Sequence, residues 1–140
     1  MADAFQFRLI TPAGVVFSGD ADRVSATGAL GDFGVLPAHA NFITALAPGF
    51  LEVKLPGGAA QSWVVSGGLA EVKDGAMTVL ANGTELPDNV DGEAAAKDEK
   101  EAGAALARKS TYDPDYPAAL EALQLARARM RAAALKSAAR

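Results

Sequence analysis

The 140-residue sequence contains no cysteine and only one histidine, His39. Without cysteine, the chain can form no disulfide, no thiolate metal site and no thiol nucleophile, which fits a reducing compartment. One imidazole cannot supply the several histidines of a zinc or iron centre within a single chain. We therefore expect neither a metal site nor a cofactor.

The sequence also has little that would place it in a membrane or a secretory pathway. Residues 33–51 carry no fully charged side chain, but prolines, glycines, His39 and Asn41 interrupt them, so we interpret this stretch as buried strands and turns. The N-terminus carries Asp3 and lacks a basic flank with an apolar core. We expect no signal peptide and see no transit peptide.

Motifs for nucleotide binding and nucleophilic catalysis are missing as well. There is no Gly-Lys-Ser/Thr phosphate loop and no GxGxxG. Ser66, His39 and Asp32 could in principle form a triad, but nothing in the sequence places them together. On chemistry alone, His39 is a packed or hydrogen-bonded loop histidine and Asp32 a solvated turn carboxylate. We predict no catalytic residue.

The charges are distributed unevenly. Residues 1–90 hold four basic and nine acidic residues, a net charge of −5, whereas residues 91–140 hold nine basic and eight acidic residues, a net +1. After Glu121 every charged residue is basic: Arg127, Arg129, Arg131, Lys136 and Arg140. An acidic body with a basic end argues against nucleic-acid binding and predicts an acidic partner for the tail.

The first 86 residues have the pattern of an all-β domain. Short apolar stretches are separated by Gly- and Pro-containing turn signals, including 47–49 and 67–68. The predicted strands are 5–9, 15–17, 23–26, 33–36, 42–46, 50–55, 62–66, 69–72 and 77–81. We predict a mainly β sandwich or barrel of about 8–10 strands over residues 1–86.

Residues 87–140 have a different, alanine-rich composition that predicts two helices, 91–109 and 116–139, capped by Asp91 and Asp115. The polar link between them, 110–116, predicts an α-helical hairpin as a second domain. Because the first helix has few large apolar residues, we expect the hairpin to detach easily. The second helix carries an apolar stripe that Arg127 interrupts: Leu120, Leu123, Met130 and Ala134.

A glycine-rich stretch provides the first family signal. Gly31-Asp32-Phe33-Gly34-Val35-Leu36-Pro37-Ala38-His39-Ala40 resembles the Gly-(Asp/Glu)-x-Gly-(Val/Ile)-x-Pro-Gly-His-Ala segment of the epsilon subunit of F-type ATP synthases, called delta in mitochondria. Three further stretches resemble that family's next motifs, in order: 45–53, 65–72 and 78–81. The resemblance covers nearly the whole chain, including the change from strands to helices.

The resemblance implies a non-catalytic rotor subunit in the central stalk of the proton-translocating ATP synthase. Such a subunit couples c-ring rotation through the gamma subunit to the catalytic alpha and beta subunits. It is held peripherally at the cytoplasmic face of the bacterial inner membrane as part of the complex. By the same resemblance, the c-ring contact falls on Leu30, Gly31, Asp32 and His39.

The resemblance also implies that the hairpin is regulatory. Extended, its second helix reaches an acidic loop of a beta subunit through Arg127, Arg129 and Arg131 and inhibits ATP hydrolysis. The chain departs from the family at Ala38, where glycine is usual, and at Asn41, where proline is usual.

A third departure concerns nucleotide. Some bacterial members bind ATP through Ile/Leu-Asp-x-x-Arg-Ala, and the matching run 90–95 has Ala94 in place of the arginine. We therefore expect no nucleotide-binding site.

A free-standing β-sandwich binding module or hydrolase, perhaps for sugars, is the alternative. It would need exposed aromatic residues or a pair of carboxylates, and the six phenylalanines fall mostly in strand patterns. Co-purification with a gamma subunit would separate the two interpretations.

Overall fold

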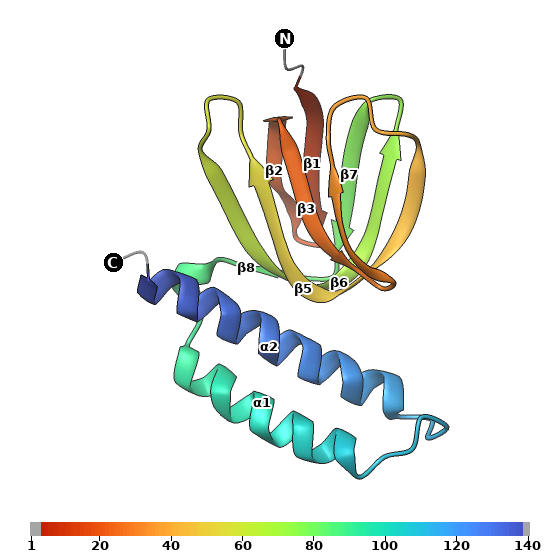
Figure 1. The fold of residues 1–140 in the computed structure, drawn as a ribbon, viewed down its shortest axis with the longest axis vertical. Helices are drawn as coiled ribbons and strands as arrows, with labels where there is room; N and C mark the ends of the chain where they lie inside the picture. Colours follow the sequence, from red (N-terminus) through yellow and green to blue (C-terminus); the bar gives the residue numbers. More distant parts are fainter. Residues whose placement is uncertain (1–3, 139–140) are drawn as a thin grey trace.

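The computed structural model describes residues 4–138 and contains a β-sandwich with a helical hairpin packed beneath it (Figure 1). The fold class is as predicted. The strands are β1 Phe5–Thr11, β2 Gly14–Ala21, β3 Arg23–Gly28, β4 Gly31–Val35, β5 Phe42–Lys54, β6 Ala60–Lys73, β7 Ala76–Ala81 and β8 Thr84–Glu85. The helices are the short 3-10 helix η1 Pro87–Asn89, α1 Gly92–Ala107 and α2 Tyr116–Ala138.

One eight-stranded sheet folds over on itself to make both layers of the sandwich. Its strand order is β2-β1-β7-β6-β5-β3-β4, with β8 paired to β6. Only the β1–β7 pair is parallel among the described strands. The strand predicted at 5–9 is confirmed as β1, in which Phe5, Phe7 and Leu9 are buried while Gln6 and Arg8 are exposed.

The turns predicted at 47–49 and 67–68 are wrong, because β5 and β6 run through these positions as continuous strands. Leu46 pairs with Gly68 and Pro48 pairs with Ser66, so the ladder continues on both sides of the bend. At Gly68, where φ is +146°, a Cβ atom would collide with the Leu80 carbonyl oxygen. The glycine permits a close backbone approach rather than a chain reversal, and two pairs of predicted strands merge.

The core between the two layers consists of large apolar side chains. Phe7, Leu9, Leu51 and Met77 are almost completely buried in it. Trp63 is also buried and meets the Phe17 ring edge-on, with 5.8 Å between the ring centroids.

The hairpin begins with the predicted cap. The Asp91 carboxylate accepts hydrogen bonds from the backbone N–H groups of Glu93 and Ala94, at 3.0 and 3.2 Å. Within the described residues, no helix has both the length and the apolar character needed to cross a membrane.

A second, smaller core joins the hairpin to the sandwich. Its buried members are Phe50, Val64, Val90, Ala95, Ala128 and Ala132. The apolar stripe predicted on α2 is wrong in part, because Leu123 is buried but Met130 and Ala134 are exposed. Alanines face the sheet instead, since small side chains let a helix approach the strands closely.

Candidate partner-binding surfaces

Four strands carry a row of apolar side chains on the outer face of the sandwich. The ladder places Ala45 beside Leu69, Leu69 beside Leu80, and Leu80 beside Ile10. Leu69 is 38% exposed and Leu80 49%, and nearby Ile43 is 61% exposed. Exposed apolar side chains that gather in one place are typical of protein interfaces. We call Ile10, Ile43, Ala45, Leu69 and Leu80 the apolar row.

Sequence reasoning missed the apolar row, although β7 carries a usable signal. Its consecutive residues Val79, Leu80 and Ala81 put apolar side chains on both faces of the strand. A strand with apolar side chains on both faces is normally covered on both faces. Only one face of β7 meets the core, so its other face is available to a partner.

The β3–β4 turn projects one apolar side chain from the edge of the sheet. Leu30 at its tip is fully exposed, and the Ala29 N–H is anchored to the Ala45 carbonyl at 2.9 Å. Gly31 has a φ of +129°, a conformation that favours glycine. Asp32 follows on β4, exposed and opposite Thr27 of β3. Leu30, Gly31 and Asp32 therefore form one continuous surface.

His39 lies apart from that surface, at the opposite end of β4, in the loop before β5. Its Nδ1 is 2.9 Å from the Ala40 carbonyl oxygen, and its ring lies 5.1 Å from the Phe42 ring. The structure therefore separates His39 from the other three residues predicted for the c-ring contact.

The same loop retains a glycine-like conformation in spite of Ala38. Pro37 precedes Ala38, whose φ is +63°, and the His39 N–H donates to the Leu36 carbonyl at 3.2 Å. Proline followed by a residue of positive φ is the pattern of a type II turn, which normally takes glycine at this place. Ala38 therefore holds an unfavourable backbone conformation.

Asn41, the other departure in this loop, has a contact that proline could not make. Its side-chain oxygen accepts a hydrogen bond from the backbone N–H of Asp74 at 3.0 Å. This bond ties the β4–β5 loop to the β6–β7 turn.

Arg129 of α2 is held by carboxylates from two other elements. Its Nε donates to Glu85 of β8 at 2.9 Å, a second guanidinium nitrogen donates to the same carboxylate at 3.3 Å, and Asp98 of α1 lies 3.5 Å away. The hydrogen bond to Glu85 is the main cause that raises the pKa of Arg129 above its ordinary value. A two-point contact of this kind fixes orientation as well as charge.

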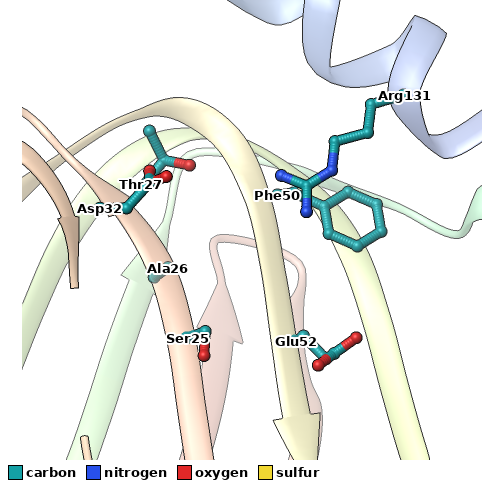
Figure 2. A pocket seen from close by; sticks show the side chains of 7 residues that line it. All are labelled: Ser25, Ala26, Thr27, Asp32, Phe50, Glu52 and Arg131. Carbon is teal, nitrogen blue, oxygen red and sulfur yellow. The ribbon is translucent and has the colours of Figure 1, made fainter. Parts of the chain in front are cut away.

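The other two arginines predicted to contact a beta subunit also have partners within the chain. Arg127 lies 3.7 Å from Glu99, a longer and more exposed ion pair. The Arg131 guanidinium lies 5.0 Å from the centroid of the Phe50 ring. Figure 2 shows Arg131 reaching from α2 over this ring, beside a groove of about 190 Å³ that Asp32 and Glu52 also line. The packing of α2 against the sandwich thus places Asp32 and Arg131 on the lining of one groove.

The triad considered from the sequence is not assembled. The Ser66 hydroxyl donates a hydrogen bond to the Gly83 carbonyl at 3.3 Å, whereas His39 contacts Ala40 and Phe42. Among the described residues, no three His, Cys, Asp or Glu side chains are grouped so that they could hold a metal ion.

Known proteins place this chain in a family. The model of the family described as "ATP synthase, Delta/Epsilon chain, beta-sandwich domain" matches residues 4–87. The chain belongs to this family. It is 40% identical to the ATP synthase epsilon chain of Geobacter sulfurreducens over 136 residues, which cover 95% of this chain and 96% of that one.

A second relative matches over a shorter range, and a solved structure matches at lower sequence identity. The epsilon chain of Rhodopseudomonas palustris strain BisB5 is 50% identical over 78 residues, only 57% of its length and 56% of this chain. A chain in the structure of the Euglena gracilis mitochondrial ATP synthase with its c-ring superimposes with a TM-score of 0.76 at 25% identity, covering 98% of this chain and 82% of that one. The sandwich-plus-hairpin arrangement is therefore shared along nearly the whole chain.

Proposed function

We propose that this chain is a non-catalytic rotor subunit of a proton-translocating F-type ATP synthase. It sits in the central stalk and carries c-ring rotation through the gamma subunit to the catalytic alpha and beta subunits. The observation that carries this proposal is the match to the Geobacter epsilon chain along nearly its full length, since it includes both the sandwich and the hairpin. No observation favours the alternative of a free-standing binding module or hydrolase.

We propose that the two parts of the chain divide the work. Residues 1–86 bind the stalk and the c-ring, and residues 87–140 form the regulatory hairpin. The apolar row is the surface that we assign to the gamma subunit. Leu69 and Leu80 leave large apolar areas in water in the isolated chain, and a permanent partner would remove them from solvent.

We assign the c-ring contact to Leu30, Gly31 and Asp32. A fully exposed leucine beside an exposed carboxylate suits a partner loop that is polar with an apolar patch. His39 is left out of this contact because it lies at the other end of β4. Through these partners, the chain is held peripherally at the cytoplasmic face of the bacterial inner membrane and binds no nucleic acid.

Cysteine cross-linking tests the c-ring contact, and the absence of native cysteines makes it specific. Asp32→Cys should form a disulfide with a cysteine placed in the polar loop of the c-ring, since such bonds need Cα atoms within about 7 Å. Lys54→Cys is the control, because Lys54 is exposed and pairs with Arg23 at the end of β3 away from the turn. Failure at Asp32, Gly31 and Leu30 alike would contradict the assignment.

The inhibitory role of the hairpin has its own test. Replacing Arg127, Arg129 and Arg131 together by alanine should raise ATP hydrolysis by the assembled complex and leave coupled synthesis largely intact. Alanine preserves helix propensity, so the change removes charge and contact alone. Arg108→Ala, an exposed cation at the end of α1, is the matched control. Unchanged hydrolysis in the triple variant would contradict the role.

We also propose that the chain does not sense ATP. Ala94 offers no guanidinium, and the Asp91 carboxylate already occupies N–H groups at the start of α1. Losing one charged contact to phosphate costs on the order of 1.5–3 kcal/mol, or about tenfold to more than a hundredfold in affinity. Calorimetric titration with ATP and magnesium should show no binding at millimolar ATP. A micromolar dissociation constant would contradict this.

A further inference from the structure

The basic surface of α2 is already occupied within the chain. Arg127 faces Glu99 and Arg129 faces Glu85 and Asp98, while Arg131 lies over the Phe50 ring. These partners come from α1, from β8 and from β5. The docked hairpin thus engages the same three arginines that the proposed contact with an acidic partner would use, and Arg129 has the closest carboxylate contacts of the three.

Arg129 differs from Arg127 and Arg131 because it links α2 both to the sandwich and to α1. Its partner in the sandwich is Glu85 of β8, 44 residues away in the sequence, and its partner on α1 is Asp98. The side chains of Arg129 and Glu85 are only 23% and 31% exposed, whereas that of Arg127 is 65% exposed. Water therefore screens the Arg129–Glu85 contact less than the Arg127–Glu99 contact.

The other contacts between the hairpin and the sandwich involve mainly small side chains. The second core contains few large side chains, namely Phe50, Val64 and Val90 with the half-buried Leu125 of α2 beside them, and its fully buried helical members are alanines. Each alanine removes little apolar area from water, so the free energy that docks the hairpin is modest. A single two-point ion pair is then a large share of it.

We propose that Arg129, Glu85 and Asp98 form a latch that keeps the hairpin docked and holds the Arg129 guanidinium within the chain. Glu85 and Asp98 act as internal substitutes for the carboxylates of an acidic partner surface. This regulation rests on the proposed function, in which that surface belongs to a beta subunit. The same guanidinium cannot serve both sets of carboxylates, so docking and partner binding exclude each other.

The latch sets the affinity for the partner as well as the position of the hairpin. A partner that binds only the undocked form has an apparent affinity reduced by the fraction of chains that are undocked. The internal carboxylates also compete at the high effective concentration of groups on one chain. Weakening the latch therefore strengthens partner binding without any change at the arginines.

The test measures docking in the full chain by energy transfer between two dyes. The native chain has no cysteine, so cysteines at Gln61 on β6 and Ala134 on α2, both exposed, take the labels selectively. Glu85→Gln removes the charge from the latch at nearly constant size. It should raise the ratio of undocked to docked chains about tenfold, the effect of losing one charged hydrogen bond. Glu71→Gln, an exposed site on the outer face of β6, should leave the ratio unchanged.

Arg129→Gln completes the experiment. In the Arg129→Gln background, Glu85→Gln should have no further effect, because the partner it would lose is already gone. A ratio that Glu85→Gln does not change, or an equal effect of Glu85→Gln with and without Arg129, would overturn the latch.

ATP hydrolysis by the assembled complex separates the latch from the function on which it rests. If the hairpin is inhibitory, Glu85→Gln should lower hydrolysis, because more chains are undocked with all three arginines intact. Increased undocking without a change in hydrolysis would support the latch and contradict the inhibitory role. Unchanged docking would overturn the latch whatever hydrolysis does.

Discussion

Leu51 and Phe50 are neighbours on β5 and belong to different cores. Leu51 points between the two layers of the sandwich, where it packs among large side chains and is 1% exposed. Phe50 points the other way, toward α2, where it meets Ala128 and Ala132. One strand thus serves both the core of the sandwich and the interface with the hairpin. The size of the opposing side chains separates the two roles.

The two interfaces also differ in how they use charge. No charged or polar side chain is buried within the described part of the chain, and the sandwich core is purely apolar. The hairpin interface has the Arg129–Glu85 ion pair at its border. Apolar burial is non-directional, whereas an ion pair has a defined geometry. An arginine can exchange one carboxylate partner for another.

The largest effect should come from the sandwich core. Leu51→Ala should reduce the free energy of unfolding by about 3 kcal/mol, because it removes buried apolar volume and leaves a cavity. Denaturant unfolding followed by circular dichroism measures this. The adjacent, exposed Glu52→Ala should stay within about 0.5 kcal/mol of the wild type. A loss below about 1 kcal/mol for Leu51→Ala would remove the contrast between the two cores.

Phe50→Ala should have a smaller effect, although phenylalanine is the larger residue. It should weaken the docking of the hairpin on the sandwich by about 1–2 kcal/mol. Its buried partners on α2 are alanines, and we expect the hairpin to leave the sheet without unfolding the sandwich. Limited proteolysis within the link 110–116 and in the helices should speed up, while the denaturant midpoint of the sandwich changes little. If Phe50→Ala destabilises the sandwich as much as Leu51→Ala, the two cores are one cooperative unit.

Ala38→Gly should stabilise the chain by about 0.5–1 kcal/mol. The left-handed conformation costs alanine roughly 1–2 kcal/mol, and the greater freedom of glycine in the unfolded chain offsets part of the gain. Ala40→Gly, two residues on in the same loop, is the control and should be slightly destabilising, because alanine is not strained there. Thermal unfolding of both variants measures the difference, and a destabilised Ala38→Gly chain would refute the strain.

The smallest effect concerns the link between the helices. Lys109 donates a hydrogen bond to Asp115 at 2.6 Å, which lowers the pKa of that carboxyl below its ordinary 3.8. Because the pKa is lowered, the stabilisation is present above the ordinary value and is lost as the pH falls through the lowered one. A carbon-detected NMR titration should find this lowered pKa, and Lys109→Met should return it toward 3.8. An unchanged pKa in that variant would show that Lys109 is not its cause.

Local sequence patterns determined the framework of this protein. The alternation in 5–9 produces β1, and the change to alanine-rich sequence after residue 86 produces the hairpin. Asp91 caps α1 as its position predicts. These features depend on residues within a few positions of one another, so a linear reading finds them. The family signal in 31–40 is local in the same way.

Tertiary structure decided the rest. The bends in β5 and β6 depend on how closely Gly68 approaches Leu80, and the apolar row exists only once β1, β5, β6 and β7 lie side by side. The sequence predicted an acidic partner for the three arginines but did not indicate that Arg129 would contact Glu85, 44 residues away in the same chain. Such contacts join residues that the chain brings together only by folding. Their free energy belongs to the pair, and neither residue reveals it alone.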